Sequence, residues 1–121
     1  MPDVPAVYAG SWYDSYAKAT TDNFEALSDR FDDQYLVMGA WTHGGVGPWE
    51  RTFSGELDYG EAATRAYNET RLRFFDRFLK GRDTWDDAPV QYVRLGTGSG
   101  GRTARGRLDH GGEWAEAAPG R

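Results

Sequence analysis

Two short apolar segments, separated by a stretch with helical periodicity, constrain the fold of this chain more than any other feature. The first spans residues 4–9 and the second spans residues 35–40. Both are continuous apolar runs of the kind found in strands that are buried in a parallel sheet. A strand, a helix and a second strand in this order indicate two neighbouring parallel strands joined by a helical crossover. The chain is therefore expected to belong to the α/β class.

The segment between these strands is predicted to form a helix within about residues 17–31. Asp22 and Glu25 have the spacing of a capping box, which favours a helix start in their vicinity. Large apolar residues recur at spacings of three and four, as on one face of a helix, namely Phe24, Leu27 and Phe31.

A second helix is expected over residues 67–80, after an extended, glycine-containing loop at residues 44–60. Gly81 stands where a C-terminal capping glycine belongs. The apolar face of this helix is predicted to carry Tyr67, Thr70, Phe74, Phe75 and Phe78. Its other face is predicted to carry mainly Arg71, Arg73, Asp76, Arg77 and Lys80.

The last predicted strand covers residues 90–95, where apolar and polar side chains alternate as in a half-buried strand. From Gly96 onward the chain is rich in glycine and arginine, and Leu108 and Trp114 are nearly its only large apolar residues. A sheet with so few strands leaves its edges and much of its apolar surface uncovered. We therefore expect an incomplete sheet that self-associates through an exposed edge.

Composition excludes several classes of partner. The net charge of −5 gives no electrostatic reason to expect binding to nucleic acid or to an anionic membrane. No apolar run approaches the roughly 20 residues that span a bilayer, and no signal peptide is visible. The chain has no cysteine, which excludes disulfides and thiolate metal sites. The compartment stays open, with the cytoplasm favoured over secretion.

Each of the first two predicted strands is followed by an acid–base residue. Asp14 follows the first strand and His43 follows the second. Open α/β folds place their chemistry at the carboxyl ends of the strands, where these two side chains would lie side by side. They would supply the carboxylate and the imidazole of a Ser-Asp-His triad, in the chain order that α/β hydrolases use. Alternatively, Asp14 is a capping or turn carboxylate and His43 a loop histidine bonded to backbone.

Several segments in the same order resemble the CocE/NonD hydrolases, which belong to the Xaa-Pro dipeptidyl-peptidase group with cocaine esterase and α-amino-acid ester hydrolases. Gly10-Ser11-Trp12-Tyr13-Asp14 is similar to the segment G-x-W-x-D that bears the catalytic aspartate. Residues 39–44 are similar to the segment G-P-W-x-H that bears the catalytic histidine, with Ala40 in place of proline. Further similar segments are the linker at 55–60, the last helix of the hydrolase domain at 74–81, and the opening of the jelly-roll domain at 101–114.

This resemblance implies a partial α/β-hydrolase fold that contains the last strands and helices of the parallel sheet and runs into the start of a β jelly roll. Residues 1–82 would be the C-terminal part of the hydrolase domain. Residues 83–121 would hold a linker and the first jelly-roll strand or strands. It also implies hydrolysis of small ester, amide or Xaa-Pro peptide substrates through an acyl-serine, with His43 as the base, Asp14 as its orienting carboxylate and no cofactor.

The chain departs from the family in lacking a nucleophile elbow, G-x-S-x-G. The nearest approach is at Ser99, which follows the histidine instead of preceding the aspartate. Ser11 and Ser15 would be neighbours of the carboxylate, and His110 is expected to cap a turn. The isolated chain is therefore expected to be inactive. The alternative is a non-catalytic remnant, or a module that docks on a partner supplying the rest of the sheet.

Two other interpretations concern the residues around the strand ends. Trp12, Tyr13 and Trp41 are candidates for the wall of an apolar substrate pocket, or else they pack against neighbouring elements, as Trp49 also could. A metal site could be formed by oxygen and nitrogen ligands from Asp14, His43, Glu56 and Asp58. No tight ligand spacing supports it, and we expect no metal.

Overall fold

The computed structural model describes residues 3–44, 46–95, 101–102, 108–109 and 113–117. The elements in chain order are β1 (Ala6–Tyr13), α1 (Ala17–Ser28), β2 (Gln34–Thr42), α2 (Val46–Trp49), β3 (Phe53–Ser54), β4 (Leu57–Asp58), the 3-10 helix η1 (Glu61–Ala63), α3 (Tyr67–Lys80), β5 (Val90–Arg94), β6 (Gly101–Arg102), β7 (Leu108–Asp109) and β8 (Glu113–Ala117).

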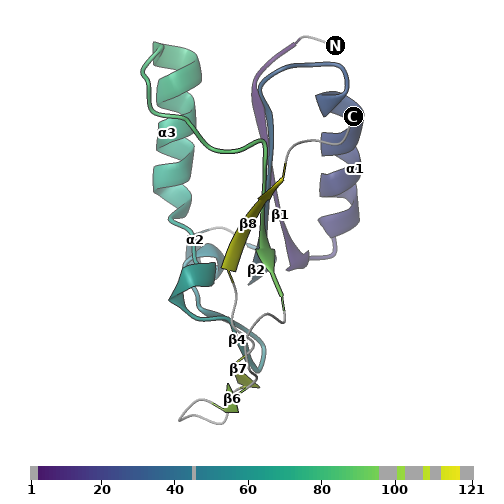
Figure 1. Cartoon of the computed structure of the whole chain (residues 1–121), viewed down its shortest axis with the longest axis vertical. Helices are drawn as coiled ribbons and strands as arrows, with labels where there is room; N and C mark the ends of the chain where they lie inside the picture. Colours follow the sequence, from purple (N-terminus) through teal and green to yellow (C-terminus); the bar gives the residue numbers. More distant parts are fainter. Residues whose placement is uncertain (1–2, 45, 96–100, 103–107, 110–112, 118–121) are drawn as a thin grey trace.

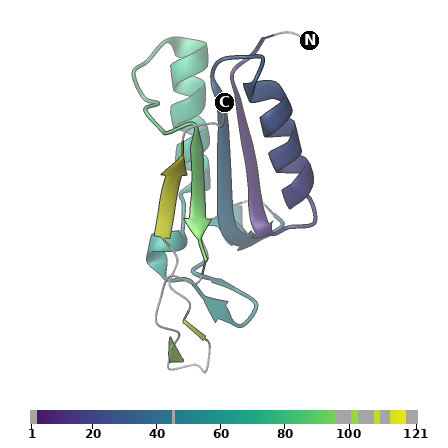
Figure 2. The same cartoon turned by 45° about the vertical axis from the view of Figure 1, so that its right-hand side comes forward.

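The main sheet has the strand order β1-β2-β5-β8. The strands β1, β2 and β5 are parallel, and β8 joins β5 in the antiparallel direction. Figure 2 shows the four arrows side by side, with β8 (yellow) pointing opposite to the other three. The expected α/β class is confirmed, with three parallel strands. β5 and β8 fall within the range 83–121 that we assigned to the linker and jelly roll, and here they belong to the main sheet.

Helices cover both faces of the sheet, as the views in Figures 1 and 2 show. On one face, Phe24 of α1 packs against Leu36 and Met38 of β2. On the opposite face lie α2 and α3, where Trp49 packs with Val37 and Trp41. The near-continuous apolar run in β2 follows from this arrangement, since a strand covered on both faces has no solvent side.

Helix α1 confirms the first helix prediction but begins earlier than the predicted capping box. Its first residue is Ala17, so Asp22 lies in the middle of the helix. There Asp22 accepts a salt bridge from Lys18, one turn earlier, at 2.5 Å. The spacing of Asp22 and Glu25 therefore does not mark a helix start, because the preceding turn at Asp14 already supplies the acceptors that begin the helix.

The segment 44–60, expected to be an extended loop, contains regular structure. A short helix, α2, is followed by the hairpin β3–β4. This hairpin belongs to a second sheet with the order β3-β4-β7-β6, which lies beyond the carboxyl ends of the parallel strands (Figures 1 and 2). Glycine content alone did not reveal these elements, because strands of two residues carry no measurable periodicity.

Helix α3 matches the prediction over residues 67–80, and Gly81 ends it in the left-handed region at φ 68°. Its faces differ from the prediction at two positions. Asp76, expected on the polar face, is buried beneath Lys80 and Arg82, with which it forms ion pairs. Phe75, expected on the apolar face, is 45% exposed. Ion pairing explains the first difference, since a buried carboxylate needs partners.

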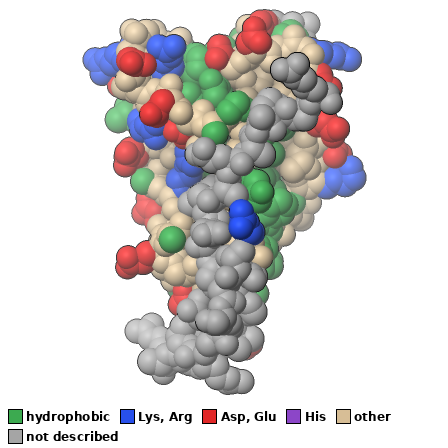
Figure 3. Space-filling view, viewed as in Figure 1, with side chains coloured by type: hydrophobic (Ala, Val, Ile, Leu, Met, Phe, Trp, Pro, Cys, Tyr) green, Lys and Arg blue, Asp and Glu red, His purple; other side chains and the backbone are tan. Residues whose placement is uncertain are grey.

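Charged side chains lie mostly along the outer margins of the molecule, over the helices, with hydrophobic side chains between them (Figure 3). None of the helices in the described part of the chain is both long and apolar enough to span a bilayer.

Candidate functional site

Asp14 and His43 lie side by side at the carboxyl ends of β1 and β2. The register pairs Tyr13 with Thr42, the last residues of the two strands. Asp14 and His43, which follow them directly, therefore leave the sheet next to each other. Oδ2 of Asp14 lies 2.8 Å from Nδ1 of His43. The structure thus brings together the two residues that the sequence singled out, in hydrogen-bonding contact.

The second oxygen of Asp14 is used by the turn that leads into α1. Oδ1 accepts a hydrogen bond from the backbone N–H of Tyr16 at 2.8 Å, and the main-chain oxygen of Asp14 accepts one from Ala17 at 3.1 Å. The turn role and the histidine-pairing role, which we treated as alternatives, are therefore filled by the same residue. The reason is that a carboxylate has two oxygens that accept independently.

These contacts lower the pKa of Asp14 below its ordinary value. The largest cause is the hydrogen bond from the backbone of Tyr16, and the hydrogen bond and charge of His43 act in the same direction. Partial burial opposes them without reversing the shift. Asp14 is therefore an anion at neutral pH, as an orienting carboxylate must be.

The pair is buried on one side and open on the other. The Asp14 side chain is 12% exposed, and that of His43 is 69% exposed. With a proton on Nδ1 donated to Asp14, the Nε2 atom carries a free lone pair. This arrangement can accept a proton at Nε2 from an approaching group, which is the first act of a general base.

Ser11 holds the ends of the two strands in this position. Its hydroxyl is completely buried, donates to the carbonyl oxygen of Trp41 and accepts the backbone N–H of Tyr13 at 3.3 Å. It lies where the pairing between β1 and β2 shifts in register. Ser11 is thus engaged in structure, and Ser15 is exposed next to Asp14. Ser99 and His110 lie outside the described residues.

The three aromatic residues expected to line a pocket are placed in separate contacts. The indole N–H of Trp12 donates to the carbonyl oxygen of Val93 at 2.8 Å. The Tyr13 hydroxyl is hydrogen bonded to the hydroxyl of Tyr59. Trp41 is 4% exposed and stacks on Trp49, with ring centroids 4.6 Å apart. Of the three, Trp41 is packed in the core, whereas Trp12 and Tyr13 are each 42% exposed.

Two aromatic residues near the dyad were not singled out from the sequence. Tyr16 places its ring 5.4 Å from that of His43, centroid to centroid. Tyr59, 2% exposed, pairs with Tyr13, and burial together with that hydrogen bond raises its pKa. The position of Tyr16 two residues after Asp14 was an available signal, whereas nothing local connects Tyr59 with β1.

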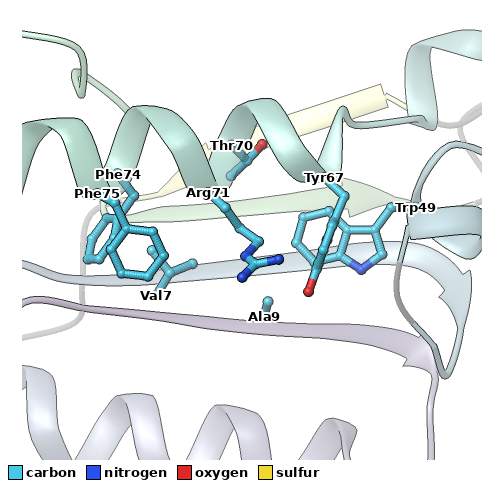
Figure 4. Close-up of a pocket in the computed structure, with 8 residues that line it drawn as sticks. All are labelled: Val7, Ala9, Trp49, Tyr67, Thr70, Arg71, Phe74 and Phe75. Carbon is cyan, nitrogen blue, oxygen red and sulfur yellow. The ribbon is translucent and has the colours of Figure 1, made fainter.

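A cavity of about 250 Å³ lies between α3 and β1, away from the dyad. Figure 4 shows Arg71 reaching from α3 across this groove, between Phe75 and Tyr67. The Arg71 guanidinium lies 5.2 Å from the centre of the Tyr67 ring. The lining is mostly apolar and consists of Val7, Ala9, Trp49, Tyr67, Thr70, Arg71, Phe74 and Phe75. Trp12, Tyr13 and Trp41 are not among these residues.

The alternative metal interpretation has no geometric support in the described part of the chain, where no three histidine, aspartate or glutamate side chains gather as ligands. The short contact between Asp14 and His43 involves one oxygen and one nitrogen only. Two ligands of this kind fall short of the four that structural zinc sites use.

No protein-family model matches the chain, and no match is found among curated proteins.

Proposed function

We propose that this chain is the part of a serine hydrolase that carries the carboxylate and the base of a Ser-Asp-His triad. The contact between Asp14 and His43 at the ends of neighbouring parallel strands is the observation that carries this proposal. The motif resemblance to the CocE/NonD hydrolases supports the same assignment. The substrates would be small esters, amides or Xaa-Pro peptides, and the nucleophilic serine would come from outside these residues.

In this mechanism, Nε2 of His43 removes the proton of the serine hydroxyl while the serine oxygen attacks the carbonyl carbon of the substrate. The resulting imidazolium is stabilised by Asp14, which holds Nδ1–H. His43 then returns the proton to the departing alcohol or amine, leaving an acyl-serine. A water molecule, deprotonated in turn by His43, releases the acid and restores the serine.

The proposed parent domain is an α/β hydrolase whose sheet extends beyond β1. β1 is the outer strand of the main sheet, eight residues long, with no charged residue and no proline. Edge strands that face solvent usually carry such protective residues, so their absence supports a further strand beside β1. We also propose that a jelly roll begins after β5, and that β6 and β7, which pair with each other outside the main sheet, belong to it.

The test is covalent labelling with a fluorophosphonate probe, which reacts with activated serines. The isolated chain is expected to remain unlabelled. The longer protein encoded by the surrounding DNA, expressed whole, is expected to be labelled at one serine upstream of these residues. In that protein His43→Ala should slow labelling by orders of magnitude, since removing one triad member disables the others.

Two results would overturn the proposal. One is a whole protein in which no serine is labelled, and the other is a His43→Ala protein labelled at the original rate. Labelling of a serine within the isolated chain would refute the separate claim that the nucleophile is absent. Ala26→Lys, an exposed change on α1, provides a matched control that should leave the labelling rate unchanged.

The second candidate function is a docking module that binds an extended strand of a partner protein along β1. It is favoured by the same uncharged edge, and by the apolar cavity beside it. Main-chain hydrogen bonds would supply the affinity and the cavity would receive the partner's side chains. If this is the function, Ala9→Lys in the cavity lining should abolish partner binding while His43→Ala leaves it intact.

A further inference from the structure

Tyr16 contacts both members of the dyad. Its backbone N–H donates to Oδ1 of Asp14 at 2.8 Å, on the oxygen that does not face the histidine. Its ring lies against the ring of His43, with centroids 5.4 Å apart and planes inclined by 52°. One residue therefore fixes the carboxylate through its backbone and meets the imidazole through its side chain.

We propose that the Tyr16 side chain is a positioning residue that holds the His43 ring in the orientation in which Nδ1 faces Asp14. A contribution of Tyr16 to catalysis rests on the proposed function, whereas its contact with the His43 ring is independent of that function. Because Asp14 already pairs with His43 through one hydrogen bond, the contribution of Tyr16 is to restrict the rotation of the His43 ring.

The exposure of His43 is the reason that such a residue is needed. A ring that is 69% exposed has few walls around it, and the second side-chain torsion of histidine is broad. A single hydrogen bond at Nδ1 competes with water in this setting. The Tyr16 ring beside the imidazole reduces the alternative orientations of His43, and the centroid distance of 5.4 Å lies within the range in which aromatic rings attract one another.

The turn at Asp14 places the Tyr16 ring. The N–H of Tyr16 is bound to Asp14, and its carbonyl oxygen accepts the N–H of Thr20 at 2.9 Å as α1 begins. The backbone of Tyr16 is thus held at both ends, although its side chain is 61% exposed. An exposed aromatic side chain on a fixed backbone fits a role in orientation better than one in the core.

Nitrogen-15 NMR of the histidine rings in the folded chain tests the proposal. The chain has only two histidines, so the signals of His43 can be assigned by comparison with His110→Ala. The unaltered chain and Tyr16→Phe should both show Nδ1 protonated and Nε2 unprotonated when the ring is neutral. In Tyr16→Ala, the population of His43 rings that are hydrogen bonded to Asp14 should fall about two- to tenfold relative to the population that is not. This range corresponds to the free energy of one aromatic contact.

Tyr16→Leu serves as a second variant, because it keeps apolar bulk at the helix start and removes only the ring. It should resemble Tyr16→Ala in the histidine spectrum, and the backbone amide spectrum reports whether either variant has unfolded. An unchanged nitrogen signature in a folded Tyr16→Ala or Tyr16→Leu chain would overturn the proposal. A changed signature in a whole protein without hydrolase activity would uphold the positioning role and refute the proposed function.

Discussion

Oδ2 of Asp14 and Nδ1 of His43 lie 2.8 Å apart across 29 residues of sequence. The two residues lie close together because the β-α-β connection places β2 parallel to β1 and next to it, so that both strands end at the same edge of the sheet. The other carboxylate oxygen of Asp14, Oδ1, accepts a hydrogen bond from the backbone N–H of Tyr16 in the turn before α1. The carboxylate therefore cannot rotate away from His43 without breaking this second hydrogen bond. This double attachment is what distinguishes the pair from an accidental surface contact.

Asp14→Asn is expected to keep the role of residue 14 in the turn before α1 and to impair its pairing with His43. The asparagine oxygen can still accept the N–H of Tyr16, so the fold should persist, but the pairing with protonated Nδ1 of His43 is weakened. In the whole hydrolase we expect kcat to fall by about 10⁴-fold, as for the corresponding change in a serine protease. Steady-state kinetics on an activated ester would measure it, and a loss below tenfold would contradict the role of Asp14.

Gly39→Ala is expected to destabilise the fold by about 1–3 kcal/mol, the usual cost of overpacking. The Trp41 ring folds back over Gly39, so that a Cβ atom at residue 39 would overlap the ring. Urea unfolding measures the change. Gly47→Ala is the matched control, since a Cβ atom there meets only the Arg51 side chain at 3.9 Å. Equal stabilities for the two variants would show that Trp41 can move aside freely.

Asp76 is expected to make the stability depend on pH in acid. Its pKa lies below the ordinary value of 3.8 chiefly because Lys80 donates to it, with Arg82 acting in the same direction against burial. A lowered pKa in the folded state means that the ionised form stabilises the fold above about pH 4 and that this contribution is lost as the pH falls toward the folded-state value.

The free energy of unfolding of Asp76→Asn should therefore be lower than that of the unaltered chain at pH 7, and the difference should shrink toward pH 3. Asp83→Asn is the control, because Asp83 is fully exposed and lies 3.9 Å from Arg77. Chemical unfolding at several pH values gives the comparison. A difference that stays constant from pH 7 to pH 3 would show that the ion pairs of Asp76 contribute nothing.

Ala9→Lys is expected to reduce self-association of the isolated chain. A lysine on the uncharged strand β1 introduces the charge by which natural edge strands prevent pairing. Sedimentation analysis should give the unaltered chain an average mass above the monomer value of 13.5 kDa, and Ala9→Lys a mass closer to it. Ala26→Lys adds the same charge on the exposed surface of α1 and should not change the mass. A strictly monomeric unaltered chain would contradict this prediction.

Local patterns in the sequence were sufficient for the elements that surround the dyad. The apolar runs of β1 and β2, and the spacing of apolar residues in α1 and α3, identified these four elements to within a few residues. The spacing of apolar residues that is typical of a helix or a strand involves residues close in the chain, so it can be recognised in a single sequence. The pairing of Asp14 with His43 followed from them, because consecutive parallel strands end at the same edge.

Other features depended on residues far apart in the chain. The sequence alone predicted two parallel strands in the first part, and only the folded chain places β5 beside β2 and β8 beside β5. Strand order is set by which apolar faces can be covered together, and no local signal encodes it. The short strands β3 and β4 were missed for the same reason, since they exist only through pairing.

The sequence by itself determined the α/β class, the helices α1 and α3, and the placement of an acid and a base at two strand ends, because each depends on residues close in the chain. Only the tertiary structure decided that Trp41 is a core residue, that Asp76 is buried and that Tyr16 lies against His43. Burial and contact are properties of the whole packed molecule. A side chain's type limits these outcomes, and its neighbours in space select among them.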